Sequence, residues 1–264
     1  MIDFHNHIIP SVDDGSKSIE ESIEMLKYAH SIGIKEVVST IHLGHPTINN
    51  HHIEYVEILE KKRNLENILE KENIDLKIYL AAEVYMNPNI LDYLDHEYAL
   101  IGNKKYMLIE FPVIAFPPKY EDLLFKLILK GVTPIIAHPE RYRTIQQDFI
   151  EIKKFINLGC LVQIDSGSLL GLFGKNALDT SINLIKSGFC HLLGSDAHNS
   201  KKRNFCLNEG LEVAKDLIGA TASFMVREHP ENIIKGKKIN IDNYMNKIIK
   251  NKENHNNWFK RIFK

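Results

Sequence analysis

Six apolar runs in this sequence each end in side chains that can bind a metal ion. The runs span residues 1–4, 37–40, 78–82, 107–109, 134–137 and 192–194, and they are followed in order by His5 and His7, His42, Glu83, Glu110, His138, and Asp196 with His198. Continuous apolar runs of this length are typical of strands buried on both faces, as in parallel sheets covered by helices. The sequence therefore predicts an α/β fold with polar groups gathered at the strand ends.

Helical segments alternate with the predicted strands. Ser18 and Glu21 form an S-x-x-E capping box at the start of the first helix, and Gly33 ends it. Further helices are predicted over 52–72, 90–94, 120–130, 149–158, 177–187, 205–218 and 220–226, and strands over 36–40, 77–82, 106–110, 133–137, 161–164 and 191–194. About seven strand–helix units favour one distorted β/α (TIM-like) barrel over residues 1–236.

Composition limits the classes of function. The formal net charge of −1 and the lack of an evident basic groove argue against a nucleic-acid partner. We see no signal peptide, and no apolar run approaches the roughly 20 residues of a membrane span. The cysteines Cys160, Cys190 and Cys206 are odd in number and scattered, so a reducing cytoplasm is expected.

The candidate ligands are too numerous for one ion. In barrels of this kind the chemistry lies at the carboxyl ends of the strands, where all of these side chains are expected. Two or three divalent transition ions bridged by carboxylates suit the set, which comprises His5, His7, Asp14, His42, Glu83, Glu110, His138, Asp196 and His198. Asp13 is a turn carboxylate or an alternative to Asp14.

The ordered motifs resemble one known family, the polymerase and histidinol phosphatase (PHP) phosphoesterases. The resemblance is closest to the branch of bacterial capsule- and exopolysaccharide-associated protein-tyrosine phosphatases. It rests on Ile2-Asp3-Phe4-His5-Asn6-His7, Asp13-Asp14-Gly15-Ser16, Ala82-Glu83-Val84-Tyr85, Leu108-Ile109-Glu110-Phe111, Ala137-His138-Pro139-Glu140-Arg141-Tyr142 and Gly194-Ser195-Asp196-Ala197-His198-Asn199. These motifs extend over nearly all of residues 1–235.

The resemblance implies how the ligands divide among metal ions. The first ion would take His5, His7, Glu83 and Asp196; the second Glu83, Glu110 and His138; the third Asp14, His42 and His198. Mn is expected, and Fe, Zn or Co would also fit. Arg141 and Arg203 would hold the phosphate, although Arg203 could also be an ordinary charge beside Lys201 and Lys202.

The implied activity is hydrolysis of phosphotyrosine by a metal-bound hydroxide. The implied substrate is the tyrosine-rich tail of a bacterial polysaccharide-assembly tyrosine kinase. An aryl ring could lie against the apolar loop residues 111–118, which contain three prolines and cannot form regular structure. A small-molecule PHP phosphatase such as histidinol phosphatase, a nuclease and an inactive metal-binding regulator are the alternatives.

The last segment, residues 237–264, is a basic tail or helix. Trp258, Phe259, Ile262 and Phe263 would share one helical face among basic residues, which would suit contact with anionic lipid. Packing of this helix on the barrel is the preferred alternative.

Overall fold

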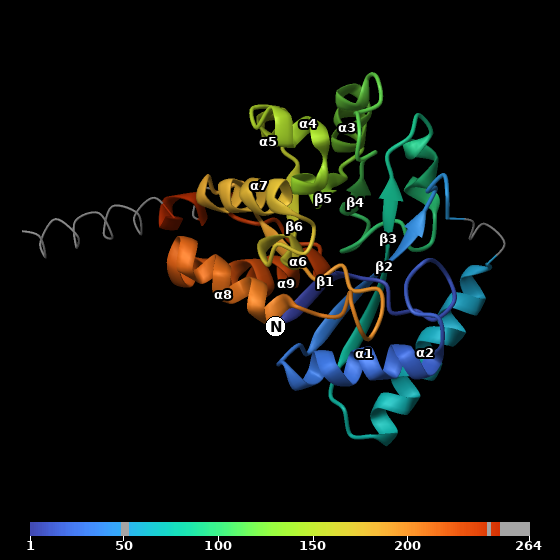
Figure 1. The fold of residues 1–264 in the computed structure, drawn as a ribbon. Coiled ribbons are helices and arrows are strands. Elements are labelled where there is room, and N and C mark those ends of the chain that lie inside the picture. The colour runs from blue at the N-terminus through green and yellow to red at the C-terminus, as the bar shows by residue number, and fades with distance from the viewer. Residues whose placement is uncertain (49–52, 242–243, 249–264) are drawn as a thin grey trace, which may run out of the picture.

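Seven parallel strands form one sheet in the order of the sequence (Figure 1). The structure is a computed structural model that describes residues 1–48, 53–241 and 244–248. The strands are β1 (Ile2–Asn6), β2 (Glu36–Leu43), β3 (Lys77–Tyr85), β4 (Tyr106–Glu110), β5 (Thr133–Ala137), β6 (Leu161–Asp165) and β7 (Leu192–Gly194). Each strand pairs in parallel with the next, which confirms the predicted parallel β/α architecture.

The sheet curls until β1 meets the end of β7. Asn6 forms a parallel bridge with Ala197. The backbone N–H of His7 donates to the carbonyl of Ala197 over 2.8 Å, and that of Asp196 donates to His5 over 2.8 Å. The nearly closed barrel thus brings the first and last predicted metal-binding motifs side by side, although about 190 residues separate them in the sequence.

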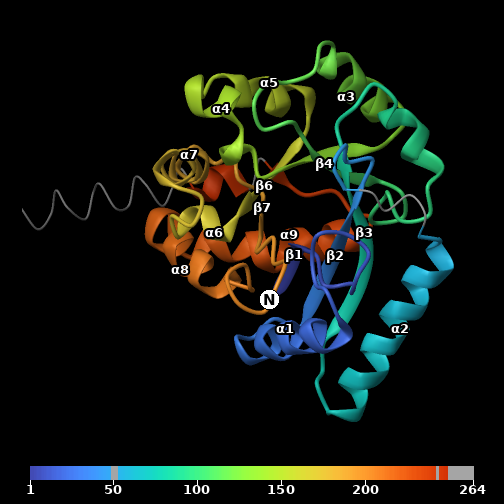
Figure 2. The same ribbon diagram turned by 45° about the vertical axis from the view of Figure 1, so that its right-hand side comes forward.

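Helices surround the strands in both ribbon views (Figures 1 and 2). They are α1 (Ile19–Ser31), α2 (Tyr55–Lys71), η1 (Ile90–Asp95), α3 (Tyr120–Leu129), η2 (Pro139–Arg141), α4 (Arg143–Gln147), α5 (Glu151–Leu158), α6 (Ser166–Leu169), α7 (Lys175–Lys186), α8 (Leu207–Ile218), η3 (Gly219–Val226) and α9 (Glu228–Ile234). Ser18 caps α1 as predicted, because its side chain accepts a hydrogen bond from the N–H of Glu21.

A small apolar cluster fills the barrel below the strand ends. Every strand contributes to it, through Phe4, Val38, Ala81, Leu108, Ile135, Leu161 and Leu192. Ile233 of α9 packs against the same cluster. Ala81 and Leu108 each lie two residues before a candidate ligand, Glu83 and Glu110, so they share its face of the strand. The packed interior therefore supports the ligands from below.

The structure corrects several predicted boundaries. Strands β2 and β3 extend to Leu43 and Tyr85, so His42 and Glu83 lie within strands rather than after them. The helix predicted over 52–72 begins at Tyr55, that predicted over 149–158 begins at Glu151, and that predicted over 220–226 is the 3-10 helix η3. Helices α4, α6 and α9 were not predicted, because seven residues or fewer carry little periodicity.

The described part of the last segment packs on the barrel. Tyr244 is buried, and its hydroxyl donates to the carbonyl of Cys190 over 2.7 Å. Ile248 is also buried. The predicted apolar face with Trp258 and Phe259 lies outside the described residues. Within the described residues, no helix is long and apolar enough to cross a membrane.

Candidate metal centre

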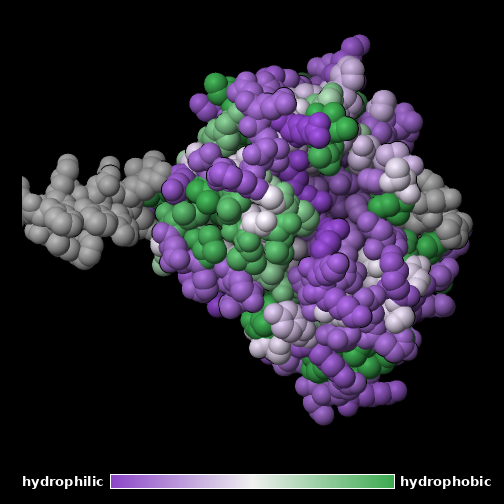
Figure 3. Space-filling view, viewed as in Figure 1, coloured by the Kyte–Doolittle hydropathy of each residue, from purple (hydrophilic) through white to green (hydrophobic). Residues whose placement is uncertain are grey.

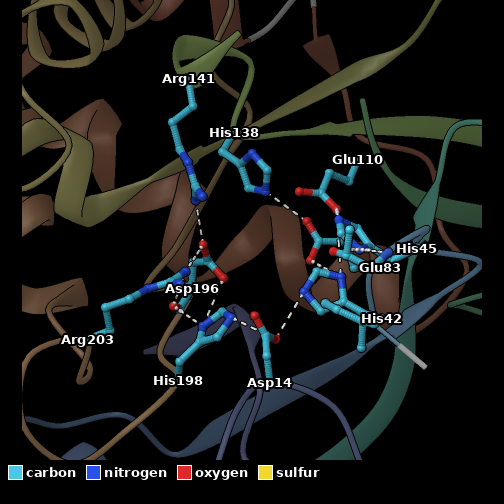
Figure 4. Close-up of a pocket in the computed structure, with 12 residues that line it drawn as sticks. Asp14, His42, His45, Glu83, Glu110, His138, Arg141, Asp196, His198 and Arg203 are labelled. Carbon is cyan, nitrogen blue, oxygen red and sulfur yellow. Dashed lines mark hydrogen bonds and ion pairs between the residues drawn. The ribbon is translucent and has the colours of Figure 1, made fainter. Parts of the chain in front are cut away.

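Nine predicted ligands converge at the carboxyl ends of the strands. Figure 4 shows seven of them, all except His5 and His7. Eight of the nine are buried, whereas Asp14 is about half exposed. Their nitrogen and oxygen atoms form overlapping groups, each within 4.8 Å: His7, Asp14, His42 and His198; His5, His7 and Asp196; His5, Glu83 and His138; and His42, Glu83 and Glu110. No predicted ligand lies outside these groups.

The first group is centred on His5 and His7. Their Nε2 atoms lie 3.2 Å apart. Glu83 Oε2 lies 3.1 Å from Nε2 of His5 and 3.4 Å from that of His7. Asp196 Oδ1 lies 3.5 and 3.4 Å from the same two nitrogens. Two imidazoles and two carboxylates thus face a single point.

The outer partners of these histidines decide which nitrogen carries the proton. Nδ1 of His5 lies 2.9 Å from Gln163 Oε1, and Nδ1 of His7 lies 2.9 Å from Asp13 Oδ2. Both oxygens can only accept, so in the neutral rings Nδ1 is protonated and Nε2 carries a lone pair. Such outer hydrogen bonds are typical of metal-binding histidines. Burial alone would lower the pKa of His5, but the charges of Glu83 and Asp196 raise it to about 9, so a positive charge is favoured at this point. A metal ion would supply that charge and take the lone pair of each Nε2 atom.

Glu83 joins the first group to a second. Its Oε1 lies 2.7 Å from Nε2 of His138, while its Oε2 faces His5. Glu110 Oε2 lies close by, 3.7 Å from Nδ1 of His42, and has no hydrogen-bond partner although it is buried. The two oxygens of Glu83 therefore face different groups, as in a carboxylate that bridges two ions.

Electrostatics in the second group also favour a cation. Burial, followed by the charge of Glu83, raises the pKa of Glu110 to about 8. Burial and the nearby Arg141 lower the pKa of His138 to about 4, so its imidazole is neutral at pH 7. His138 is thus already in its metal-binding form, whereas Glu110 is mostly protonated at pH 7. A divalent cation beside Glu83 and Glu110 would offset the crowded negative charge and displace that proton.

The third group contains Asp14, His42 and His198. Asp14 Oδ1 lies 3.4 Å from Nε2 of each histidine. Nδ1 of His198 donates to the backbone carbonyl of Asp196 over 2.8 Å, which leaves the Nε2 lone pair free for a ligand. Asp13 is instead buried behind His7 and accepts from the backbone N–H groups of Gly15 and His42. The geometry thus gives the two aspartates different positions.

Both predicted arginines line the same pocket, which has a volume of about 140 Å³. Arg141 Nη1 lies 2.5 Å and Arg203 Nη2 lies 2.7 Å from Asp196 Oδ2. Both guanidinium groups also lie over the ring of Phe173, at 4.5 Å for Arg141 and 5.8 Å for Arg203. The arginines therefore converge at one edge of the candidate metal ligands (Figure 4).

The structure adds site residues that we did not predict from the sequence. Asp165 Oδ2 lies 3.4 Å from Nη1 of Arg141, and Phe173 supports both arginines. His45 lines the pocket and packs edge-on against Tyr85 at 4.8 Å. The interval His42-x-x-His45 could have drawn attention to His45. Asp165 directly follows the predicted strand over 161–164, so the strand-end signal could have indicated it. The sequence gives no signal for Phe173, because its contacts depend on the closed barrel.

Comparisons with known proteins agree with this geometry. Residues 1–235 match the family described as capsular polysaccharide synthesis, CpsB/CapC. The chain is 35% identical to the tyrosine-protein phosphatase YwqE of Bacillus subtilis, covering 90% of this chain and 93% of that protein. It is 40% identical to the putative tyrosine-protein phosphatase CapC of Staphylococcus aureus, over 79% and 81% of the two chains.

Solved structures give the same picture. One structure, from work on YwqE of Bacillus subtilis and CpsB of Streptococcus pneumoniae described as "unique metal-dependent tyrosine phosphatases", superposes with a TM-score of 0.82 at 35% identity. The superposition covers 90% of this chain and 96% of that one. A histidinol phosphate phosphatase of Lactococcus lactis, solved with zinc, matches with a TM-score of 0.53 at 12% identity, which shows a common fold alone.

Proposed function

The chain belongs to the CpsB/CapC family of capsular polysaccharide synthesis, and we propose that it is a metal-dependent protein-tyrosine phosphatase. One observation carries the proposal beyond family membership. The Nε2 atoms of His5 and His7 lie 3.2 Å apart and face the carboxylates of Glu83 and Asp196, an arrangement that suits a bound cation. Phosphate-binding groups, Arg141 and Arg203, line the same pocket.

We assign the metal ligands to two or three divalent ions. His5, His7, Glu83 and Asp196 would hold the first, Glu83, Glu110 and His138 the second, and Asp14, His42 and His198 the third. Short distances also link His7 to the third group and His42 to the second, so these two histidines lie at the boundaries between sites. Mn is our first choice, and Fe, Zn and Co fit the same nitrogen and oxygen ligands.

The reaction is hydrolysis of the phosphoryl–phenol oxygen bond. The bound ions supply Lewis acidity, which lowers the pKa of a water molecule and offsets the charge of the phosphate. Arg141 and Arg203 donate hydrogen bonds to the phosphoryl oxygens, for which guanidinium groups are suited. A tyrosine leaving group, with a pKa of about 10, needs less protonation than an alkyl alcohol.

The substrate we propose is a phosphotyrosine protein. The capsule-related family supports a bacterial polysaccharide-assembly kinase, with its tyrosine-rich tail as the substrate. We propose a cytoplasmic location, since Cys160, Cys190 and Cys206 are unpaired thiols that suit a reducing compartment. Histidinol phosphatase activity is not favoured, because the likeness to such an enzyme extends to the fold alone.

Phosphate release from three substrates tests this function. We expect metal-loaded protein to hydrolyse a phosphotyrosine peptide with a far higher kcat/KM than a phosphoserine peptide or histidinol phosphate. Metal analysis of the same sample should give two or three ions per chain. Equal kcat/KM values for the two peptides, or full activity in metal-free protein, would refute the proposal.

A further inference from the structure

A second groove lies beside the candidate metal centre. It has a volume of about 600 Å³ and lies between α1, the segment after α6, the loop after β7 and the start of α8. Figure 3 shows an apolar area next to the hydrophilic hollow on this face of the molecule. The groove is lined by Glu24, Tyr28, Leu170, Leu172, Ser200, Lys201, Lys202, Asn204, Phe205, Cys206 and Glu209.

Large apolar side chains are exposed in this groove. The exposed fraction is 38% for Tyr28, 37% for Leu170 and 62% for Leu172. Tyr28 comes from α1, whereas the two leucines follow one another closely after α6. Exposed apolar groups that gather in one concave surface, with charged groups at the rim, are typical of binding sites rather than of ordinary surface.

The groove and the metal centre share one loop. Arg203 lines the metal pocket, and its neighbours Lys202 and Asn204 line the groove. Asn199 Oδ1 accepts hydrogen bonds from the backbone N–H groups of Lys201, Lys202 and Arg203 at 2.9–3.2 Å, which fixes the loop.

The segment after α6 joins the two sites a second time. Leu172 lines the groove, and the next residue, Phe173, lies under both pocket arginines. The two sites are therefore only one residue apart at two places, since consecutive Cα atoms are separated by about 3.8 Å.

We propose that this groove binds the substrate chain next to the phosphotyrosine. An apolar or aromatic side chain of the substrate would lie between Tyr28 and Leu172. This side chain would belong to the few residues that flank the phosphotyrosine, because the groove adjoins the metal pocket. The inference rests on the proposed function and adds a sequence preference to it. The occupant is the substrate because the chain on either side of a phosphotyrosine in the metal pocket must cross the adjoining surface.

The test compares a small substrate with two phosphotyrosine peptides. One peptide carries leucine at the three positions on each side of the phosphotyrosine, and the other carries serine there. Para-nitrophenyl phosphate fills the metal pocket without reaching the groove. The quantity measured is the ratio of kcat/KM for each peptide to kcat/KM for para-nitrophenyl phosphate.

The proteins compared are the full-length chain, Tyr28→Ala, Leu172→Ser and the control Leu129→Ser. Leu129 is 70% exposed on α3 and lies outside the groove, so it matches Leu172 in chemistry and exposure. Leu172 is next to Phe173, so Leu172→Ser can also shift the ring that supports the arginines. Tyr28 lies on a different element, so Tyr28→Ala tests the groove without that effect.

We expect the ratio for the leucine peptide to fall about tenfold in both groove variants and to stay constant in Leu129→Ser. The ratio for the serine peptide should be the same in all four proteins. An unchanged leucine-peptide ratio would overturn the groove proposal and leave the phosphatase proposal standing. Absence of para-nitrophenyl phosphate turnover by the metal-loaded full-length chain would overturn both. A change from dimer to monomer in Leu172→Ser without a change in ratio would make the groove an interface between copies, contrary to the proposal.

Discussion

His138 and Arg141 are three residues apart but have different chemical surroundings. The Nε2 atom of His138 faces Glu83, whereas the guanidinium of Arg141 faces Asp196 and Asp165. His138→Ala should remove bound metal and lower kcat about 100-fold or more. Arg141→Ala should keep the metal and lower kcat/KM about 10- to 100-fold, since charge-assisted hydrogen bonds to phosphate are lost. Metal analysis beside steady-state kinetics checks both variants, and an equal loss of metal would contradict these separate roles.

Phe173 provides a flat surface for the two pocket arginines. A cation above an aromatic face gains about 0.5–2 kcal/mol, and Arg141 is the closer of the two. Phe173→Leu keeps an apolar side chain but removes this face, so we expect kcat/KM to fall about 2- to 30-fold and inhibition by inorganic phosphate to weaken similarly. Phe173→Tyr is the matched control and should retain both. Equal inhibition by phosphate in the leucine variant would show that the ring does not hold the arginines.

Residues in local motifs could be predicted from the sequence, whereas residues that act through distant partners could not. Eight of the nine ligands were predictable because each lies at or just after a strand end, and Asp14 came from the family motif. Asp165 follows the predicted strand over 161–164 in the same way but was not singled out. Gln163 and Phe173 were not predictable, because their partners His5 and Arg141 lie far away in the sequence. Which of Asp13 and Asp14 faces the pocket depends on the path of one turn, and composition does not determine it.

His191 connects three elements at the start of β7. Its Nδ1 accepts from the N–H of Val162 in β6 over 3.0 Å, and its carbonyl accepts from Nδ1 of His229 in α9 over 2.7 Å. Burial, with a smaller contribution from His229, lowers the pKa of His191 to about 3. The ordinary value is about 6.5.

The acid sensitivity of the fold follows from this shift. Between pH 3 and 6.5 the unfolded chain binds a proton at His191 that the folded chain does not bind. The contribution of His191 to the free energy of unfolding is therefore fully present above pH 6.5 and decreases as the pH falls to 3. His191→Asn keeps an acceptor for Val162 but cannot titrate. Urea unfolding of metal-free protein should therefore show a pH slope shallower than the wild-type slope by up to about 1.4 kcal/mol per unit. Parallel curves would rule out His191 as a source of the acid sensitivity.

The element pattern was predicted well because buried parallel strands leave continuous apolar runs. The ends of β2 and β3 were predicted too early. His42, Glu83 and Tyr85 interrupt the apolar runs, but their backbones still pair with the neighbouring strands. Those strands continue because the barrel interior at this level is the polar site itself. Short helices such as α6 were missed because four residues carry no helical period, although Asp165 gives a local N-cap by accepting from the N–H of Gly167.

At the scale of the whole molecule, metal binding and folding should be coupled. The proposed ligands come from six of the seven strand ends, and an unfolded chain holds no such site. A metal present at 100 times its Kd would then stabilise the folded state by about 2.7 kcal/mol for each site. Thermal unfolding with and without chelator should show a lower Tm after metal removal, with recovery on adding Mn²⁺. An identical Tm with and without metal would contradict the coupling. Alkylation of the cysteines should leave phosphatase activity unchanged, because the proposed reaction uses no thiol.

The carboxyl-terminal segment tests where the folded unit ends. We predict a barrel over residues 1–236 followed by a basic tail or helix that preferably packs on the barrel. Tyr244 and Ile248 of this segment are buried. Burying two such side chains contributes about 1.5–3 kcal/mol each. A chain ending at Ile248 should therefore unfold at the same urea concentration as the full chain, whereas one ending at Gly236 should lose about 3–6 kcal/mol.

Vesicle binding of the same truncations separates packing from membrane contact. If residues 249–264 bind anionic lipid, the full chain should sediment with phosphatidylserine vesicles at low salt and be released at high salt, and the chain ending at Ile248 should stay in solution. We favour packing on the barrel, so we expect all three chains to remain in the supernatant. Equal stability of the chains ending at Gly236 and Ile248 would contradict the expected loss of about 3–6 kcal/mol, because the contacts of Tyr244 would then contribute nothing to the fold.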